Sequence, residues 1–136
     1  MRALPAMLVF ALLLHGCQCR IPVSVSGSLD SGITFALRES REVTYAGVTT
    51  RDGVGQWKAI WRIEGKDDLV TIRYGEATSA LSLTVDAQEL RKNQLYTFHV
   101  EDRNFWGPCV GSVTFVVTEQ GIVEECGSEE CIRKFR

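Results

Sequence analysis

Five cysteines carry the most distinctive chemistry in the sequence, because thiols can bind a metal, exchange electrons or close disulfides. Cys126 and Cys131 have four residues between them and no second closely spaced pair nearby. Zinc sites usually present paired cysteines or histidines at tighter spacing. A redox-active pair more naturally has two residues between its thiols and stands beside a helix. The spacing therefore favours structural disulfides, and we expect no metal site and no cofactor.

Few other residues suggest catalysis. His99 is the only histidine beyond the N-terminal segment, and it stands among Thr97 and Glu101 without a motif that would activate a serine or cysteine nucleophile. The sequence contains no phosphate-binding glycine loop and no metal-spaced set of His and Glu. Asp67 and Asp68 are adjacent carboxylates, but they fall in an expected turn, where solvated charges are common. We therefore predict that the protein is not an enzyme and has no catalytic residue.

Two neighbouring aromatic residues, Phe105 and Trp106, lie between polar residues and Gly107-Pro108. Loops often hold binding residues, and aromatic side chains can anchor a partner or stack on a sugar. The alternative is that both rings fold inward and cover the end of the core, with Cys109 holding the loop. We prefer the structural alternative and keep the binding loop as a functional hypothesis.

The N-terminal segment has the pattern of an export signal. One basic residue, Arg2, precedes an apolar run that ends at Leu14. The run is shorter than the roughly 20 apolar residues of a membrane-spanning helix, so it is typical of the apolar part of a signal peptide.

The residues after this run carry a resemblance. Leu14-His15-Gly16-Cys17 resembles the lipobox of bacterial lipoproteins, in which the cysteine becomes the lipid-modified first residue of the mature protein. His15 departs from the motif, which usually has a small or β-branched residue there. The resemblance implies a lipoprotein signal peptide over residues 1–16 and a membrane anchor at Cys17. Gln18, rather than Asp, implies the outer membrane of a Gram-negative cell envelope.

The number of cysteines supports lipidation. With Cys17 modified, an even set of four thiols is left for disulfides: Cys19, Cys109, Cys126 and Cys131. Ordinary signal cleavage after Cys19 would leave an odd set of three. Lipidation makes residues 17–22 a short lipid-anchored tether and residues 23–136 a single domain with a disulfide-stapled C-terminal tail. The domain should lie close to the membrane surface, since an extended residue spans at most about 3.6 Å.

Two disulfide pairings stay open. A hairpin with a three-residue loop at 119–121 would pair positions whose numbers sum to 240, and Cys109 and Cys131 meet this condition. This pairing leaves Cys19 for Cys126. The alternative joins Cys126 to Cys131 and Cys19 to Cys109, and it holds if the returning strand ends before Cys131.

Alternation of apolar and polar residues is the strongest structural signal. It recurs in about eight short segments: 23–26, 33–37, 43–45, 57–63, 70–74, 81–85, 96–100 and 113–117. Turn-forming residues separate several segments, Gly65-Lys66-Asp67-Asp68 among them, and only 87–90 could pass for a helix. The pattern predicts an all-β fold in which two antiparallel sheets pack face to face as a sandwich.

The segment from Leu90 to Val100 resembles the tyrosine corner of fibronectin type III and immunoglobulin-like domains. In such a corner the hydroxyl of the tyrosine, here Tyr96, hydrogen-bonds to backbone upstream. This segment and the one from Trp61 to Gly75 are also similar to uncharacterised proteobacterial lipoproteins with a single sandwich domain, a resemblance that covers most of 33–117. It implies a fold and an envelope location and brings no activity.

Composition limits the partners. Beyond residue 16 the chain has 17 acidic and 14 basic side chains, because Arg2 is the one charge removed from the 15 basic residues. We therefore expect no nucleic-acid partner. The function expected is a non-enzymatic, lipid-anchored envelope role, structural or in binding a periplasmic protein or glycan. The alternative is a periplasmic inhibitor or immunity protein against a wall-degrading enzyme, which a protruding loop with a presented aromatic or acidic side chain would favour.

Overall fold

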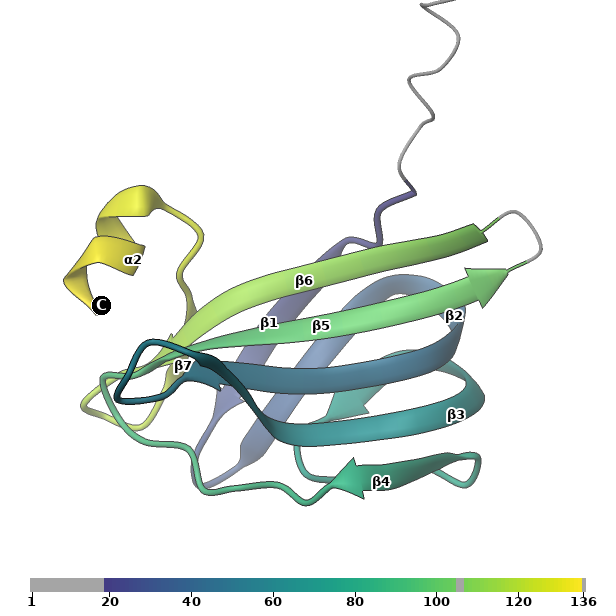
Figure 1. The fold of residues 1–136 in the computed structure, drawn as a ribbon, viewed down its shortest axis with the longest axis horizontal. Helices are drawn as coiled ribbons and strands as arrows, with labels where there is room; N and C mark the ends of the chain where they lie inside the picture. The colour runs from purple at the N-terminus through teal and green to yellow at the C-terminus, as the bar shows by residue number, and fades with distance from the viewer. Residues whose placement is uncertain (1–18, 105–106, 136) are drawn as a thin grey trace, which may run out of the picture.

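A computed structural model describes residues 19–104 and 107–135 of the chain (Figure 1). This part forms seven strands and a short helix: β1 (Val23–Ser28), β2 (Gly32–Arg51), β3 (Trp57–Arg73), β4 (Leu81–Val85), β5 (Leu95–Asn104), β6 (Gly107–Val117), β7 (Val123–Glu125) and α2 (Glu129–Lys134). All paired strands are antiparallel. The predicted all-β antiparallel fold is confirmed, with seven strands rather than about eight.

The strands are hydrogen-bonded in the order β4-β3-β2-β5-β6-β7, and β1 adds to β2. The first part of β2 pairs with β1, where Phe35 lies opposite Val25, and the last part pairs with β5, where Val48 lies opposite Phe98. Figure 1 shows β1 and the start of β2 behind β5 and β6. One open sheet therefore folds back over itself, and a division into two separate sheets is not confirmed.

The two long strands correct the sequence prediction. Segments 33–37 and 43–45 belong to β2, and segment 57–63 and residues 70–73 of segment 70–74 belong to β3. The β2–β3 register passes from Ala36 opposite Thr71 to Arg41 opposite Leu69, which is a bulge in β2. Residues 38–40 there are exposed. Polar residues and Gly65-Lys66-Asp67-Asp68 thus mark the solvent side of a bend, where both strands continue, and not a reversal of the chain.

An aromatic stack joins the two parts of the folded sheet. The rings of Phe35 in β2 and Phe98 in β5 are nearly parallel, with centroids 3.9 Å apart, and Phe115 in β6 lies 5.6 Å from Phe35. All three side chains are fully buried. Apolar side chains at alternate positions of these strands fill the space between the two layers.

The predicted tyrosine corner is present. Leu90 and Tyr96 are buried, and the Arg91 amide N–H donates a 2.7 Å hydrogen bond to the Tyr96 hydroxyl. Burial raises the pKa of Tyr96, so the phenol stays protonated and neutral. The corner holds the connection into β5 against the core.

Residues at the N-terminal end of the described chain are docked on β6. The Ile21 amide donates to the Val110 carbonyl at 2.8 Å, and the Val110 amide donates to the Cys19 carbonyl at 3.2 Å. Ile21 is 3% exposed. Residues 19–21 of the predicted tether are therefore part of the fold.

A variant in the aromatic stack should show how much the stability of the folded sheet depends on it. Phe35→Ala removes a ring from between the two layers, so we expect the free energy of unfolding to fall by about 3–5 kcal/mol in urea denaturation. Val54→Ala, at a side chain that is 81% exposed, should change it by less than about 0.5 kcal/mol. Equal losses in the two variants would contradict this role.

Two glycine variants test the docking of the N-terminal residues. A Cβ at Gly111 would lie 2.4 Å from the Ile21 carbonyl oxygen, whereas a Cβ at Gly53 meets no atom within 4 Å. We expect Gly111→Ala to lower the free energy of unfolding by about 1–3 kcal/mol and to speed hydrogen exchange at the Ile21 amide. Gly53→Ala should do neither. Unchanged exchange at Ile21 in Gly111→Ala would rule out the close approach.

Candidate functional site

A cleft of about 1130 Å³ lies on the outer face of the sheet, opposite the core, and we call it the outer-face cleft. Figure 1 shows the loop between β2 and β3 and helix α2 at the same end of the sheet, and residues from both line the cleft. Its lining is Thr49, Thr50, Arg51, Asp52, Gly53, Gly55, Trp57, Arg91, Gln94, Leu95, Thr97, His99, Thr114, Ile132 and Phe135.

The cleft floor is a row of threonines across three strands. Thr49 in β2 lies opposite Thr97 in β5, which lies opposite Thr114 in β6. The hydroxyls of Thr97 and Thr114 are 3.2 Å apart, and the Thr49 hydroxyl is 3.5 Å from His99 Nε2. Because side chains alternate along a strand, these residues face outward while Phe98 faces the core.

The β2–β3 loop forms one wall. The Asp52 carboxylate accepts hydrogen bonds from the amides of Val54 at 3.0 Å and Gln56 at 2.9 Å, which closes the loop. Trp57 follows at the start of β3 and is 60% exposed. The Arg51 guanidinium carbon lies 4.9 Å from the centroid of the Trp57 ring. The loop thus presents an indole and a cation at the cleft.

The C-terminal tail forms the other wall. Cys126 is fully buried, and its amide donates to the Thr114 carbonyl at 2.8 Å. A disulfide joins Cys126 to Cys131 in α2, and Ile132 and Phe135 beyond it line the cleft. The tail is therefore tied to β6 at the cleft floor.

Sequence analysis missed helix α2. The sequence does contain helix signals here, with Ser128 at the N-cap, acidic residues in the first turn and basic residues in the last. In the structure the Ser128 hydroxyl accepts a 3.1 Å hydrogen bond from the Cys131 amide. The helix has only six residues and buries none of them, so no apolar periodicity marks it.

His99 is the titratable group of the cleft floor most suited to acid–base chemistry. Partial burial lowers the pKa of its imidazole from the usual 6.5, because the charged form is less well solvated. Among the described residues no hydrogen bond or ion pair joins His99 to a carboxylate, the group that orients a catalytic histidine. Its geometry fits hydrogen bonding to a ligand better than activation of Thr49.

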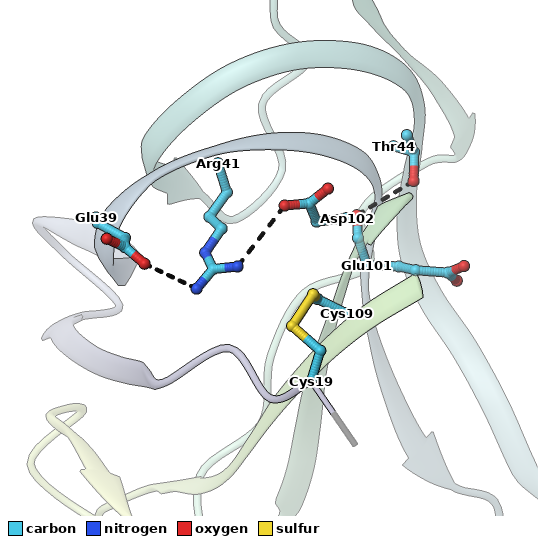
Figure 2. Close-up of polar contacts among 7 residues, drawn as sticks. All are labelled: Cys19, Glu39, Arg41, Thr44, Glu101, Asp102 and Cys109. Atoms are coloured by element: carbon cyan, nitrogen blue, oxygen red, sulfur yellow. Dashed lines mark hydrogen bonds and ion pairs between the residues drawn. A yellow bond between two sulfur atoms is a disulfide. The ribbon is translucent and has the colours of Figure 1, made fainter. Parts of the chain in front are cut away.

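A second polar group lies at the other end of β5 and β6. Figure 2 shows Arg41 between Glu39 and Asp102, near the disulfide that joins Cys19 to Cys109. The Arg41 guanidinium lies 2.9 Å from the Glu39 carboxylate and 3.9 Å from that of buried Asp102. This group links the bend of β2, which carries Glu39 and Arg41, to Asp102 in β5.

The disulfides decide between the two predicted pairings. Cys19 pairs with Cys109, and Cys126 pairs with Cys131, so the pairing of Cys109 with Cys131 and Cys19 with Cys126 is wrong. The predicted register itself is confirmed, because Val117 lies opposite Val123. The extension to Cys131 fails since β7 ends at Glu125 and the chain turns into the tail.

Cys17, Phe105 and Trp106 lie outside the residues that the structure describes. Within the described ranges, no group of three or more His, Cys, Asp or Glu side chains is arranged to hold a metal ion. No helix in the same ranges is long and apolar enough to cross a membrane.

Sequence reasoning did not find the outer-face cleft. Thr49, Thr97 and Thr114 are ordinary polar positions of three alternating strands, and only the register places them in one row. Within the segment 57–63, Trp61 is fully buried whereas Trp57 is 60% exposed, so alternation alone did not mark Trp57 as a surface residue.

Comparison with protein-family models, with curated proteins and with solved structures finds no match to this chain. No relative therefore lends it an activity, and the cleft must be understood from its own chemistry.

The lowered pKa of His99 predicts a pH dependence. The folded protein binds fewer protons than the unfolded chain at pH values just below 6.5, so the free energy of unfolding should decrease as the pH falls through this range. Urea denaturation at pH 7.5 and 5.5 measures the decrease, and nuclear magnetic resonance titration of the imidazole gives the pKa directly. His99→Gln should show a smaller decrease. A midpoint at or above 6.5 would contradict the desolvation.

Proposed function

We propose that this chain is a lipid-anchored protein of the bacterial cell envelope whose domain binds a partner or ligand without catalysis. The observation that supports binding is the outer-face cleft, which presents the exposed Trp57 beside Arg51. A solvent-exposed indole in a concave site is typical of a surface that a partner covers.

The docking of residues 19–21 suits an anchor close to the domain. In the sequence only Gln18 separates Cys17 from Cys19, and Cys19 is bonded to Cys109 in β6. A lipid on Cys17 would therefore hold the Cys109 end of β6 near the membrane. Thr114 lies five residues further along β6, about 17 Å at 3.4 Å per residue. The cleft floor at Thr114 would then lie about 17 Å along the strand from the anchored end.

A binding role without catalysis agrees with the chemistry of the cleft. His99 has a threonine hydroxyl as its neighbour and no described carboxylate to orient it. The Asp52 carboxylate is engaged with its own loop amides. The threonine hydroxyl and the imidazole can each donate and accept a hydrogen bond. Among the described residues they are not joined to a carboxylate in the way that nucleophile, base and orienting group are joined in nucleophilic catalysis.

A periplasmic inhibitor or immunity protein is the second candidate. Val54 at the β2–β3 loop is 81% exposed, next to an exposed aromatic residue. An exposed loop that presents one apolar side chain could enter the active site of a wall-degrading enzyme. The concave cleft beside it favours ligand binding as the first candidate.

Intact mass of the mature protein tests the anchor. We expect the mature polypeptide to begin at Cys17 and to carry acyl groups. Several acyl groups, at about 0.8 kcal/mol per buried methylene, anchor a protein stably in a membrane. Cys17→Ser should move the protein from the membrane fraction to the soluble fraction. The double variant Cys19→Ser/Cys109→Ser should stay lipidated and membrane-bound. A mass without acyl chains, or a chain that starts after Cys19, would exclude the anchor.

Crosslinking the same membranes separates the two candidate functions. We expect affinity capture of the wild-type protein to yield an envelope ligand. The same capture with Cys17→Ser, which lacks the anchor, should not yield it. One dominant hydrolase, lost in Val54→Asp, would instead identify an inhibitor. Equal capture by both forms would contradict a role at the membrane surface.

A further inference from the structure

We propose that the outer-face cleft binds an acidic glycan. This inference rests on the proposed binding role and adds the chemical class of the ligand. Three features of the cleft support this class. They are a floor of side-chain hydroxyls on strands that are paired on both sides, an exposed indole in the wall, and a positive charge.

The floor suits a saccharide better than a peptide strand. β2 is paired on both sides by β3 and β5, β5 by β2 and β6, and β6 by β5 and β7. A peptide that binds by strand addition needs a sheet edge, and the cleft floor is a sheet face. The groups left to the ligand are the hydroxyls of Thr97 and Thr114 and the imidazole of His99.

These groups match the hydrogen-bonding pattern of a sugar. A hydroxyl donates one hydrogen bond and accepts others, and a neutral imidazole has one donor and one acceptor nitrogen. Sugar hydroxyls have the same mixed character. The row Thr49, Thr97 and Thr114 extends across three strands, so it can contact several hydroxyls of a saccharide.

The wall supplies an apolar surface. The Trp57 indole is 60% exposed, and Leu95, Ile132 and Phe135 also line the cleft. A flat aromatic ring has an apolar face, which can cover the C–H face of a pyranose ring while the sugar hydroxyls reach the floor. The cleft volume of about 1130 Å³ is above the roughly 300–1,000 Å³ of small-molecule sites, so it has room for more than one sugar ring.

The charge of the cleft selects an acidic glycan. Arg51 and Arg91 line it, and neither forms an ion pair with a carboxylate among the described residues. The one carboxylate of the lining, Asp52, already accepts two amide hydrogen bonds. Two guanidinium groups against this one carboxylate give the lining a formal net charge of 2 − 1 = +1, although the whole chain has a net charge of −2. Guanidinium groups bind carboxylates and phosphates well, so sugar carboxylates and sugar phosphates share this chemistry.

Calorimetric titration of the full chain in detergent micelles tests the proposal. The probes are a carboxylated cell-wall disaccharide, a phosphorylated core oligosaccharide of lipopolysaccharide, a neutral disaccharide and an acidic hexapeptide. We expect one of the two acidic glycans to bind most tightly. The tighter one shows whether the cleft takes a sugar carboxylate or a sugar phosphate. Trp57→Ala should weaken that binding about tenfold or more, the scale of a lost aromatic stacking contact.

Further variants separate the three features. Thr97→Val/Thr114→Val removes two hydroxyls at nearly constant shape and should weaken binding, whereas Thr71→Val, on an exposed β3 position outside the cleft, should leave it unchanged. Arg51→Gln should reduce binding of the acidic glycan and bring it toward that of the neutral one. Circular dichroism of each variant shows whether the fold is kept.

Three results would overturn the inference: no detectable binding of either acidic glycan, equal binding by folded Trp57→Ala, or tighter binding of the neutral sugar or the peptide. If a membrane partner is captured but no glycan binds, the glycan inference fails and the binding role stands. If the glycan binds but the mature protein has no lipid, the anchor fails and the glycan site stands.

Discussion

The fold depends on one constraint: a single sheet has to close over itself and bury its inner face. The bend of β2 and β3 brings Phe35 over Phe98, and the two rings stack at 3.9 Å with Phe115 beside them. Without the bend, the apolar residues of β1 and the start of β2 would have no layer to cover them. The exposed residues 38–40 and the bulge beside Arg41 are therefore requirements of the core rather than irregularities.

The two disulfides have different physical effects. Cys19–Cys109 spans a sequence separation of 90, so by loop-closure entropy it stabilises the fold by about 4–5 kcal/mol. Cys126–Cys131 spans a separation of 5 and contributes about 2 kcal/mol in the same treatment. The first joins the segment at Cys19 to β6. The second restrains the tail that carries Ile132 to the cleft.

Sequence patterns predicted much of what depends on local chemistry, although the capping signals of α2 were missed. Alternation found the strands, Leu90 and Tyr96 found the corner, and the loop at 119–121 gave the β6–β7 register. The bend at Gly65 was taken for a turn because exposed polar residues mark both. The cleft could not be found, since Thr49, Thr97 and Thr114 meet only through a register of strands far apart in the chain.

The outer-face cleft uses parts of the chain that the core does not need. Thr97 and His99 face outward because Phe98 and Val100 face inward, and the β2–β3 loop only places Trp57 at the rim. Leaving about 60% of an indole in water forgoes about 2–4 kcal/mol of apolar burial, taking 150–250 Å² per aromatic side chain and about 25 cal/mol per Å². That free energy is unused in folding and would become available if a ligand covered the ring, so the proposed binding would need no rearrangement of the core.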